Sequence, residues 1–82
     1  MNNKMFERIL GLVSEGYAVE FRPFREDCVE ICLREGVFRS ARVFDPSEYK
    51  YIVGMTEEDW ILRILDMIEY EFKKYAVEAR GE

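Results

Sequence analysis

The sequence offers few of the side chains that enzymes use for catalysis. None of the 82 residues is histidine, so an ordinary serine or cysteine triad would lack its general base. The serines Ser14, Ser40 and Ser47 lie in no nucleophile-elbow context, and the five glycines are scattered rather than gathered in a phosphate-binding loop. We therefore expect that the protein is not an enzyme and holds no cofactor.

The two thiols, Cys28 and Cys32, lie four residues apart in a segment that alternates like a β-strand. At about 3.3 Å per residue they would be roughly 13 Å apart, which is too far for a disulfide between them. Their spacing differs from Cys-x-x-Cys, and no histidine completes a zinc site. We expect both cysteines to stay reduced and to act as small hydrophobic side chains.

The carboxylates are numerous and unevenly distributed along the chain. The formal net charge is −5, and residues 45–82 contain ten acidic and five basic side chains, whereas acids and bases balance in residues 1–44. A negative surface repels the phosphates of nucleic acid and attracts basic proteins. The charge distribution therefore favours a basic protein partner over direct binding of nucleic acid.

One long amphipathic helix, predicted from Thr56 to Ala79, must position most of these carboxylates. Thr56 followed by Asp59 has the spacing of a capping box and marks the N-terminus. Apolar residues recur at helical spacing on one face, with Trp60 and Ala76 beside them. This predicted buried stripe comprises Ile61, Ile64, Leu65, Ile68, Phe72, Tyr75 and Ala79. The opposite, outer face carries Asp59, Leu62, Asp66, Glu69, Tyr70 and Lys73.

Part of the charge on that outer face is expected to be matched within the helix. Asp59 with Arg63, and Glu69 with Lys73, have the i,i+4 spacing of favourable ion pairs. Tyr70 differs from these residues, because tyrosine is enriched at the centres of protein interfaces. The outer face of the last helix is therefore a candidate binding surface.

A shorter amphipathic helix is predicted at the N-terminus. Asn2 or Asn3 can cap it, and Gly16 suits the residue after its end near Glu15. Its apolar stripe consists of Met5, Ile9, Leu12 and Val13, widened by Phe6 and Leu10. We expect this stripe to face the sheet.

Alternation with a period of two predicts three strands, over residues 17–22, 28–34 and 37–44, joined by a polar connection at 23–27 and a hairpin at 34–36. Gly36 favours a three-residue hairpin loop that pairs Leu33 with Val37, and Val29 with Ala41. This register places Val37, Ala41 and Val43 on the core face, and Phe38, Ser40, Arg42 and Phe44 on the other face. A two-residue loop would exchange these sets, because a shift by one residue turns a strand over.

Residues 45–48, Asp-Pro-Ser-Glu, are typical of a helix start, with a capping residue, proline at the first position and glutamate at the third. That helix is expected to be short, because Ile52 and Val53 look extended and Gly54 interrupts the pattern. Consecutive strands with short loops form an antiparallel meander, and two amphipathic helices can cover one face of it. We predict a single α+β domain over residues 1–82, with two layers and the order αβββα.

The same element order occurs in double-stranded-RNA-binding domains, which carry basic residues at the start of the last helix. Here that helix opens with Glu57-Glu58-Asp59. An acidic start repels phosphate, so the charges argue against RNA binding.

A helix leads into Gly16-Tyr17-Ala18-Val19-Glu20, a hairpin follows at Arg34-Glu35-Gly36, and Arg42-Val43-Phe44 precedes the isoleucine- and leucine-rich last helix. In this order, in acidity and in size, the chain resembles small acidic phage and prophage proteins, including some type II anti-CRISPR inhibitors. In those inhibitors, acidic side chains mimic DNA phosphates in the arginine-lined site that reads the target-adjacent duplex. The resemblance implies a partner-binding surface here, with Tyr70 of the outer face beside it. Its acidic members would be Asp45, Glu48, Glu58, Asp59, Asp66 and Glu69.

Two functional hypotheses follow. The first is an inhibitor of mobile-element origin that binds a basic, nucleic-acid-binding host protein, such as an RNA-guided nuclease. The second is a structural module without an inhibitory role, which dimerises through a sheet face that carries Cys28, Cys32, Phe38 and Phe44. The sequence has no apolar run of about 18 residues and no secretory pattern at its N-terminus, so we expect no membrane span and a cytoplasmic location.

Overall fold

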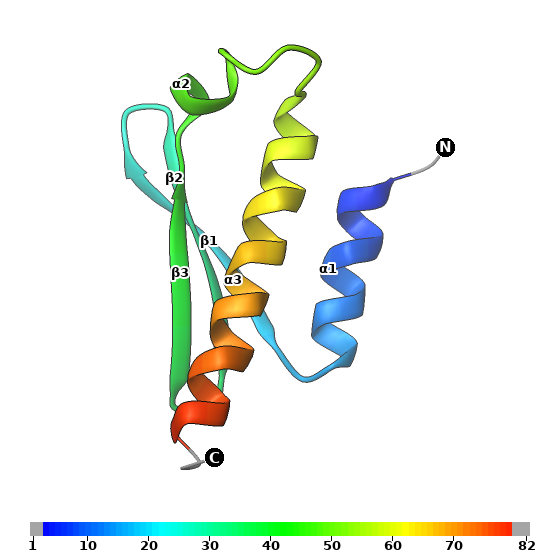
Figure 1. Cartoon of the computed structure of the whole chain (residues 1–82), viewed down its shortest axis with the longest axis vertical. Helices are drawn as coiled ribbons and strands as arrows, with labels where there is room; N and C mark the ends of the chain where they lie inside the picture. The colour runs from blue at the N-terminus through cyan, green and yellow to red at the C-terminus, as the bar shows by residue number, and fades with distance from the viewer. Residues whose placement is uncertain (1–2, 80–82) are drawn as a thin grey trace.

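The computed structural model describes the backbone of residues 3–79 and the side chains of residues 3–75. The elements in chain order are α1 (Lys4–Ser14), β1 (Ala18–Arg25), β2 (Cys28–Glu35), β3 (Phe38–Phe44), α2 (Pro46–Tyr49) and α3 (Glu57–Ala79). The strands form one antiparallel sheet in the order β1-β2-β3. Both long helices lie on the same side of this sheet (Figure 1). The predicted two-layer α+β architecture, αβββα, is confirmed.

Each helix begins at a side chain that satisfies a free backbone N–H group. In α1, the Asn3 side chain accepts a hydrogen bond from the Phe6 N–H at 2.9 Å. In α3, the Thr56 Oγ1 accepts from the Asp59 N–H at 3.1 Å, while the Asp59 carboxylate accepts from the Thr56 N–H at 3.2 Å. This reciprocal pair is the capping box predicted from the sequence, and it fixes where the long helix starts.

The core lies between the sheet and the two long helices. Ile31 and Leu33 of β2 are buried there against the apolar stripe of α3. The Tyr17 ring meets the Phe72 ring edge-on at a centroid distance of 5.1 Å, which is a favourable aromatic geometry. The complete buried cluster comprises Leu12, Tyr17, Ile31, Leu33, Phe44, Ile64, Leu65, Ile68 and Phe72.

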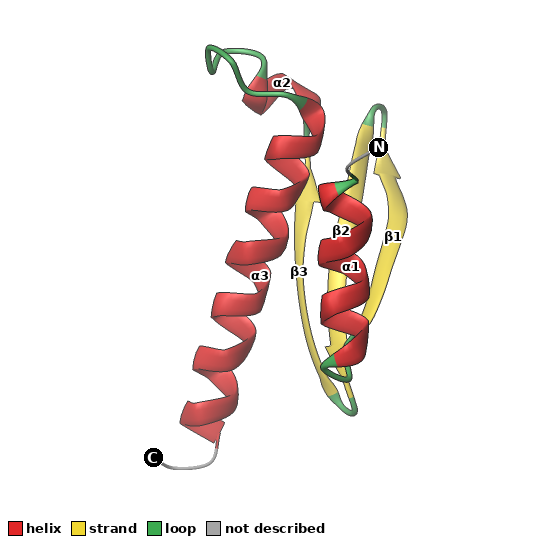
Figure 2. Cartoon of the chain, turned by 90° about the vertical axis from the view of Figure 1, so that its right-hand side faces the viewer, coloured by secondary structure: helices red, strands yellow, loops and turns green. Residues whose placement is uncertain are grey.

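One predicted member of the α3 stripe, Tyr75, is not buried: its side chain is 61% exposed. The C-terminal end of α3 leans away from the sheet (Figure 2), and Tyr75 borders a hollow on the outer surface of this helix. Ala79 was predicted to belong to the same stripe, and Ala76 to lie beside it. The side chains of both residues lie outside the part of the chain that the structure describes.

The β2–β3 hairpin has a two-residue loop, so the predicted three-residue loop is wrong. Glu35 pairs with Phe38, and Leu33 pairs with Ser40. Gly36 adopts a positive φ of 62° at the first loop position, as glycine does in type II′ hairpins. The shift by one residue turns β3 over. As a result Phe38, Ser40, Arg42 and Phe44 face the helices, while Ala41 and Val43 lie on the open face.

Strand β1 also extends further than predicted. Residues 23–25 belong to the strand rather than to a connection, since Pro23 pairs with Val29 and Arg25 pairs with Cys28. The register shifts between Pro23 and Arg25, as in a β-bulge. Proline is tolerated there because β1 is an edge strand and a proline needs no ladder hydrogen bond on the free side.

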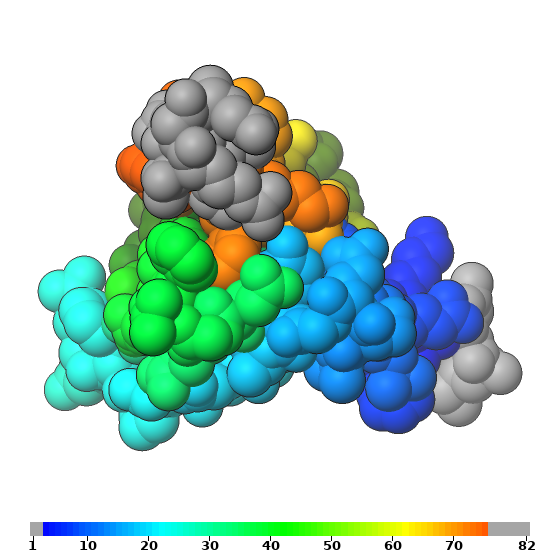
Figure 3. Space-filling view, turned by 90° about the horizontal axis from the view of Figure 1, so that it is seen from below, coloured from blue at the N-terminus to red at the C-terminus, as the bar shows by residue number. Residues whose placement is uncertain are grey.

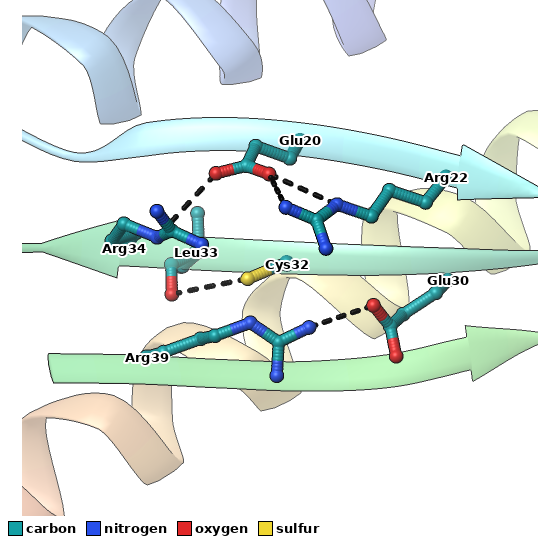
Figure 4. Close-up of polar contacts among 7 residues, drawn as sticks. All are labelled: Glu20, Arg22, Glu30, Cys32, Leu33, Arg34 and Arg39. Atoms are coloured by element: carbon teal, nitrogen blue, oxygen red, sulfur yellow. Dashed lines mark hydrogen bonds and ion pairs between the residues drawn. The ribbon is translucent and has the colours of Figure 1, made fainter.

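The open face of the sheet is covered by ion pairs rather than by apolar side chains (Figure 4). Glu20 contacts Arg22 at 2.7 Å and Arg34 at 3.5 Å. Arg39 contacts Glu30 at 2.7 Å across the neighbouring strands. The predicted apolar face that would combine Cys28 and Cys32 with Phe38 and Phe44 is therefore wrong, because the two phenylalanines face the helices.

Both cysteines are free and buried, which confirms that they form no mutual disulfide. Cys32 has no exposed surface and lies among the charged side chains of the open face.

We expect both thiols to react with a thiol reagent more than about tenfold more slowly in the native protein than in denaturant, because reaction requires opening of the fold. Counting adducts by mass spectrometry checks this, with a chain unfolded without reductant as the control. A native mass lower by two hydrogens, or equal labelling rates, would contradict it.

Candidate functional site

The residues implicated by the sequence occupy two separate regions of the structure. Asp45, Glu48, Glu58 and Asp59 lie at one end of the molecule, around α2, the connecting loop and the first turn of α3 (Figure 1). We call this region, together with Glu57, the acidic end. Asp66, Glu69 and Tyr70 lie further along α3. The candidate residues therefore do not form one continuous surface.

Two carboxylates of the acidic end are occupied by helix capping. Asp45 accepts hydrogen bonds from the Ser47 hydroxyl at 2.8 Å and from the Ser47 N–H at 2.9 Å, and thereby starts α2. These hydrogen bonds lower the pKa of Asp45, and those from Thr56 lower the pKa of Asp59. Both groups remain charged, with Asp59 exposed and Asp45 partly buried, and their first role is to hold the two helix N-termini in place.

The other three carboxylates of the acidic end are uncommitted. Glu48, Glu57 and Glu58 are exposed, and within residues 3–75 their side chains make no ion pair or hydrogen bond. Glu57 was not among the predicted site residues, although its place beside Glu58 in an acidic helix start was a visible signal. These three side chains are available to an external basic group.

The loop between α2 and α3 carries an apolar tip next to these carboxylates. Tyr51 is 88% exposed, Val53 is fully exposed and Ile52 is partly exposed. Ile52 and Val53 were expected to be extended, but the segment turns instead, with Gly54 at a positive φ of 79°. Large apolar side chains held in water at a loop tip are typical of interaction surfaces.

Glu69 was predicted to lie on the free outer face of α3, but the structure places it against α1. Its side chain is only 15% exposed and contacts the Arg8 guanidinium at 2.5 Å, while Asp66 contacts the same group at 2.9 Å. Lys73 reaches Glu69 at 3.4 Å, which confirms the predicted i,i+4 pair. Burial raises the pKa of Glu69, but the hydrogen bond and charge of Arg8 outweigh it, so the net pKa is lowered. Glu69 and Asp66 therefore hold α1 against α3.

Tyr70 is 71% exposed and faces outward, as expected for its position on the helix. It borders a shallow hollow of about 490 Å³ on the outer surface of α3. The hollow is lined by Arg63, Asp66, Met67, Tyr70, Glu71, Lys74 and Tyr75. Two cationic and two anionic side chains line it, so the hollow lacks the excess of negative charge found at the acidic end.

The chain matches no protein-family model, no curated protein and no solved structure. Across residues 3–79, no cluster of three or more histidine, cysteine, aspartate or glutamate side chains could hold a metal ion. In the same part of the chain, no helix is both long and apolar enough to cross a membrane.

Proposed function

We propose that this protein binds another protein through its acidic end and covers a basic, nucleic-acid-binding surface of that partner. The observation that carries the proposal is the combination of Glu48, Glu57 and Glu58, all exposed and without an ion pair to residues 3–75, with the apolar tip at residues 51–53. Carboxylates attract arginine and lysine side chains that otherwise hold phosphates.

The two components of this surface would contribute differently to binding. The carboxylates act over a distance of about one Debye length, 8–10 Å at physiological ionic strength, and mainly accelerate association. The apolar tip acts only on contact, where a buried tyrosine commonly accounts for much of the binding free energy. The surface is therefore suited to a basic groove with an apolar patch in it.

The resemblance to type II anti-CRISPR inhibitors suggests the class of partner. We propose an RNA-guided nuclease of the host, whose arginine-lined site for the target-adjacent duplex is a basic surface of this kind. Binding there would inhibit the nuclease by excluding DNA. In this proposal Glu69 and Asp66 keep their structural role, and the contact is made by the acidic end.

Replacing both Glu57 and Glu58 with glutamine is expected to slow association with the partner about tenfold at low salt, because long-range attraction is lost. The difference should shrink at high salt, where screening removes the same attraction from the parent protein. The partner is first captured from host lysate and purified. Surface plasmon resonance at two salt concentrations then measures how the parent protein and the variant bind to it. Nucleic acid should compete with the parent protein for the partner.

The matched control is the variant with Glu7 and Glu35 replaced by glutamine. This variant also removes two exposed carboxylates, and Glu7, like Glu57 and Glu58, is in the first turn of a helix. Both residues are far from the acidic end in sequence. If both variants slow association equally, only the net charge matters. If neither does, or if nucleic acid fails to compete, the proposed binding surface is wrong.

A further inference from the structure

The outer flank of α1 is an apolar surface that none of the described residues covers. Phe6, Leu10 and Val13 are 57%, 50% and 51% exposed, although they lie at the i, i+4, i+7 spacing of one helix face. The predicted stripe of α1 is wider than its contact with the rest of the protein, since Leu12 enters the core and Arg8 turns toward α3. Seen from below, α1 projects at one side of the molecule (Figure 3).

Strand β1 continues this apolar surface. Phe21 pairs with the core residue Ile31, so the Phe21 side chain lies on the helix side of the sheet, and it is 46% exposed. β1 is an outer strand of the sheet, with α1 lying over it (Figure 2). The backbone groups on its outer side pair with no strand among the described residues, and such an edge is a template for a further strand.

The charges of β1 indicate which strand fits that edge. Glu20 and Arg22 flank Phe21 symmetrically and project from the open face, on the opposite side from α1. If a second β1 pairs antiparallel about an axis through Phe21, Glu20 of each copy lies opposite Arg22 of the other. Opposite charges at directly paired positions stabilise an antiparallel sheet, and like charges destabilise it. The strand is therefore complementary in charge to itself.

We propose that two copies of this chain associate through β1 to form a continuous six-stranded sheet. Pro23 has no N–H group and precedes the bulge, so the new ladder is short and centred on residues 20–22, with Phe21 of one copy opposite Phe21 of the other. On the helix side, Phe21 and the flank of α1 from each copy come together across the two-fold axis and leave water. On the open face, the contacts of Glu20 with Arg22 and Arg34 within each chain extend to a network of six side chains.

This association is independent of the function proposed for the acidic end. The two β1 strands run in opposite directions in this dimer. The two acidic ends therefore lie at opposite ends of the dimer, far apart. A partner could then bind each end separately. Loss of the dimer would remove this bivalence, but it would leave each acidic end intact.

Sedimentation equilibrium of the full chain tests the proposal. We expect the parent protein to be a dimer. In Arg22→Glu and in Leu10→Glu, the affinity of dimerisation should be at least about tenfold weaker, equal to 1.4 kcal/mol. By symmetry, Arg22→Glu creates two repulsive pairs with Glu20. The double exchange Glu20→Arg with Arg22→Glu should restore dimerisation, because it restores opposite charges across the axis. Circular dichroism of each variant verifies that the fold is retained.

Val37→Glu is the matched control for Leu10→Glu, since it places a glutamate at an exposed apolar residue in the β2–β3 loop, outside both α1 and β1. That variant should remain dimeric. A parent protein that stays monomeric up to about 1 mM, where even weak specific complexes form, overturns the proposal. It is also overturned if folded Arg22→Glu and Leu10→Glu chains dimerise as the parent does.

Discussion

Replacing Ile68 with alanine is expected to lower the free energy of unfolding by about 2–5 kcal/mol, because the change leaves a cavity in the centre of the core. Ile68 has no exposed surface and packs in the cluster between α3 and the sheet. Alanine favours the helix, so the loss comes from packing and not from the backbone. For a domain of this size the loss is a large share of its total stability. Urea denaturation at one fixed protein concentration measures it.

Ile52→Ala is the matched control, since it removes the same atoms from a residue that is 37% exposed in the loop before α3. We expect that change to cost no more than about 0.5–1 kcal/mol, as is usual for surface positions. If the two variants unfold at the same urea concentration, Ile68 is not a core residue and the packing of α3 on the sheet is wrong.

The contact between Arg8 and Glu69 supplies the second large effect. Replacing Arg8 with methionine keeps the apolar part of the side chain but removes the charge, and leaves the 15%-exposed Glu69 carboxylate without its main partner. We expect a loss of about 1–2 kcal/mol at neutral pH, at the low end for charged hydrogen bonds because Arg8 is partly exposed to solvent. Urea denaturation of Arg8→Met, Glu69→Gln and the double variant isolates the interaction between the two residues.

The effect of Arg8→Met should depend on pH. The net pKa of Glu69 in the folded protein is lowered from its ordinary value of 4.5, so the stability that Glu69 contributes is present above that pH and lost as pH falls through the folded value. In the Arg8→Met variant, burial acts on Glu69 with less opposition and raises its pKa. The difference in unfolding free energy between parent and variant should therefore shrink on acidification. A difference that stays constant between neutral and strongly acidic pH would contradict this role of Arg8.

The sequence by itself determined the order of the elements, the ends of the helices and the main core stripe. These features depend on interactions between residues close in the chain. Thr56 and Asp59 cap each other across one turn, and Asp45 caps α2 over two residues. The spacing of Ile64, Leu65 and Ile68 already assigns them to one helix face, and a sheet of alternating strands offers an apolar surface for them to cover.

The register of the second hairpin was not determined in this way. Two loop lengths, differing by one residue, fit the pattern around Gly36, and they bury opposite faces of β3. The choice depends on which face packs better against α3, which lies far along the chain. Phe38 meets the Phe72 ring of α3 there, and Phe44 stacks on Tyr49 of α2. Only the assembled core distinguishes the two registers.

The candidate surfaces were likewise decided by the tertiary structure, because exposure depends on which elements lie side by side. Glu69 is on the polar face of α3, yet α1 packs beside it and Arg8 covers it. Leu10 is in the apolar stripe of α1, yet it stays half exposed, because no element of the described chain covers it. Helical periodicity gives the direction in which a side chain points from the axis of its helix. Whether that direction points to water or to another element depends on packing between distant segments, and the local pattern does not contain this information.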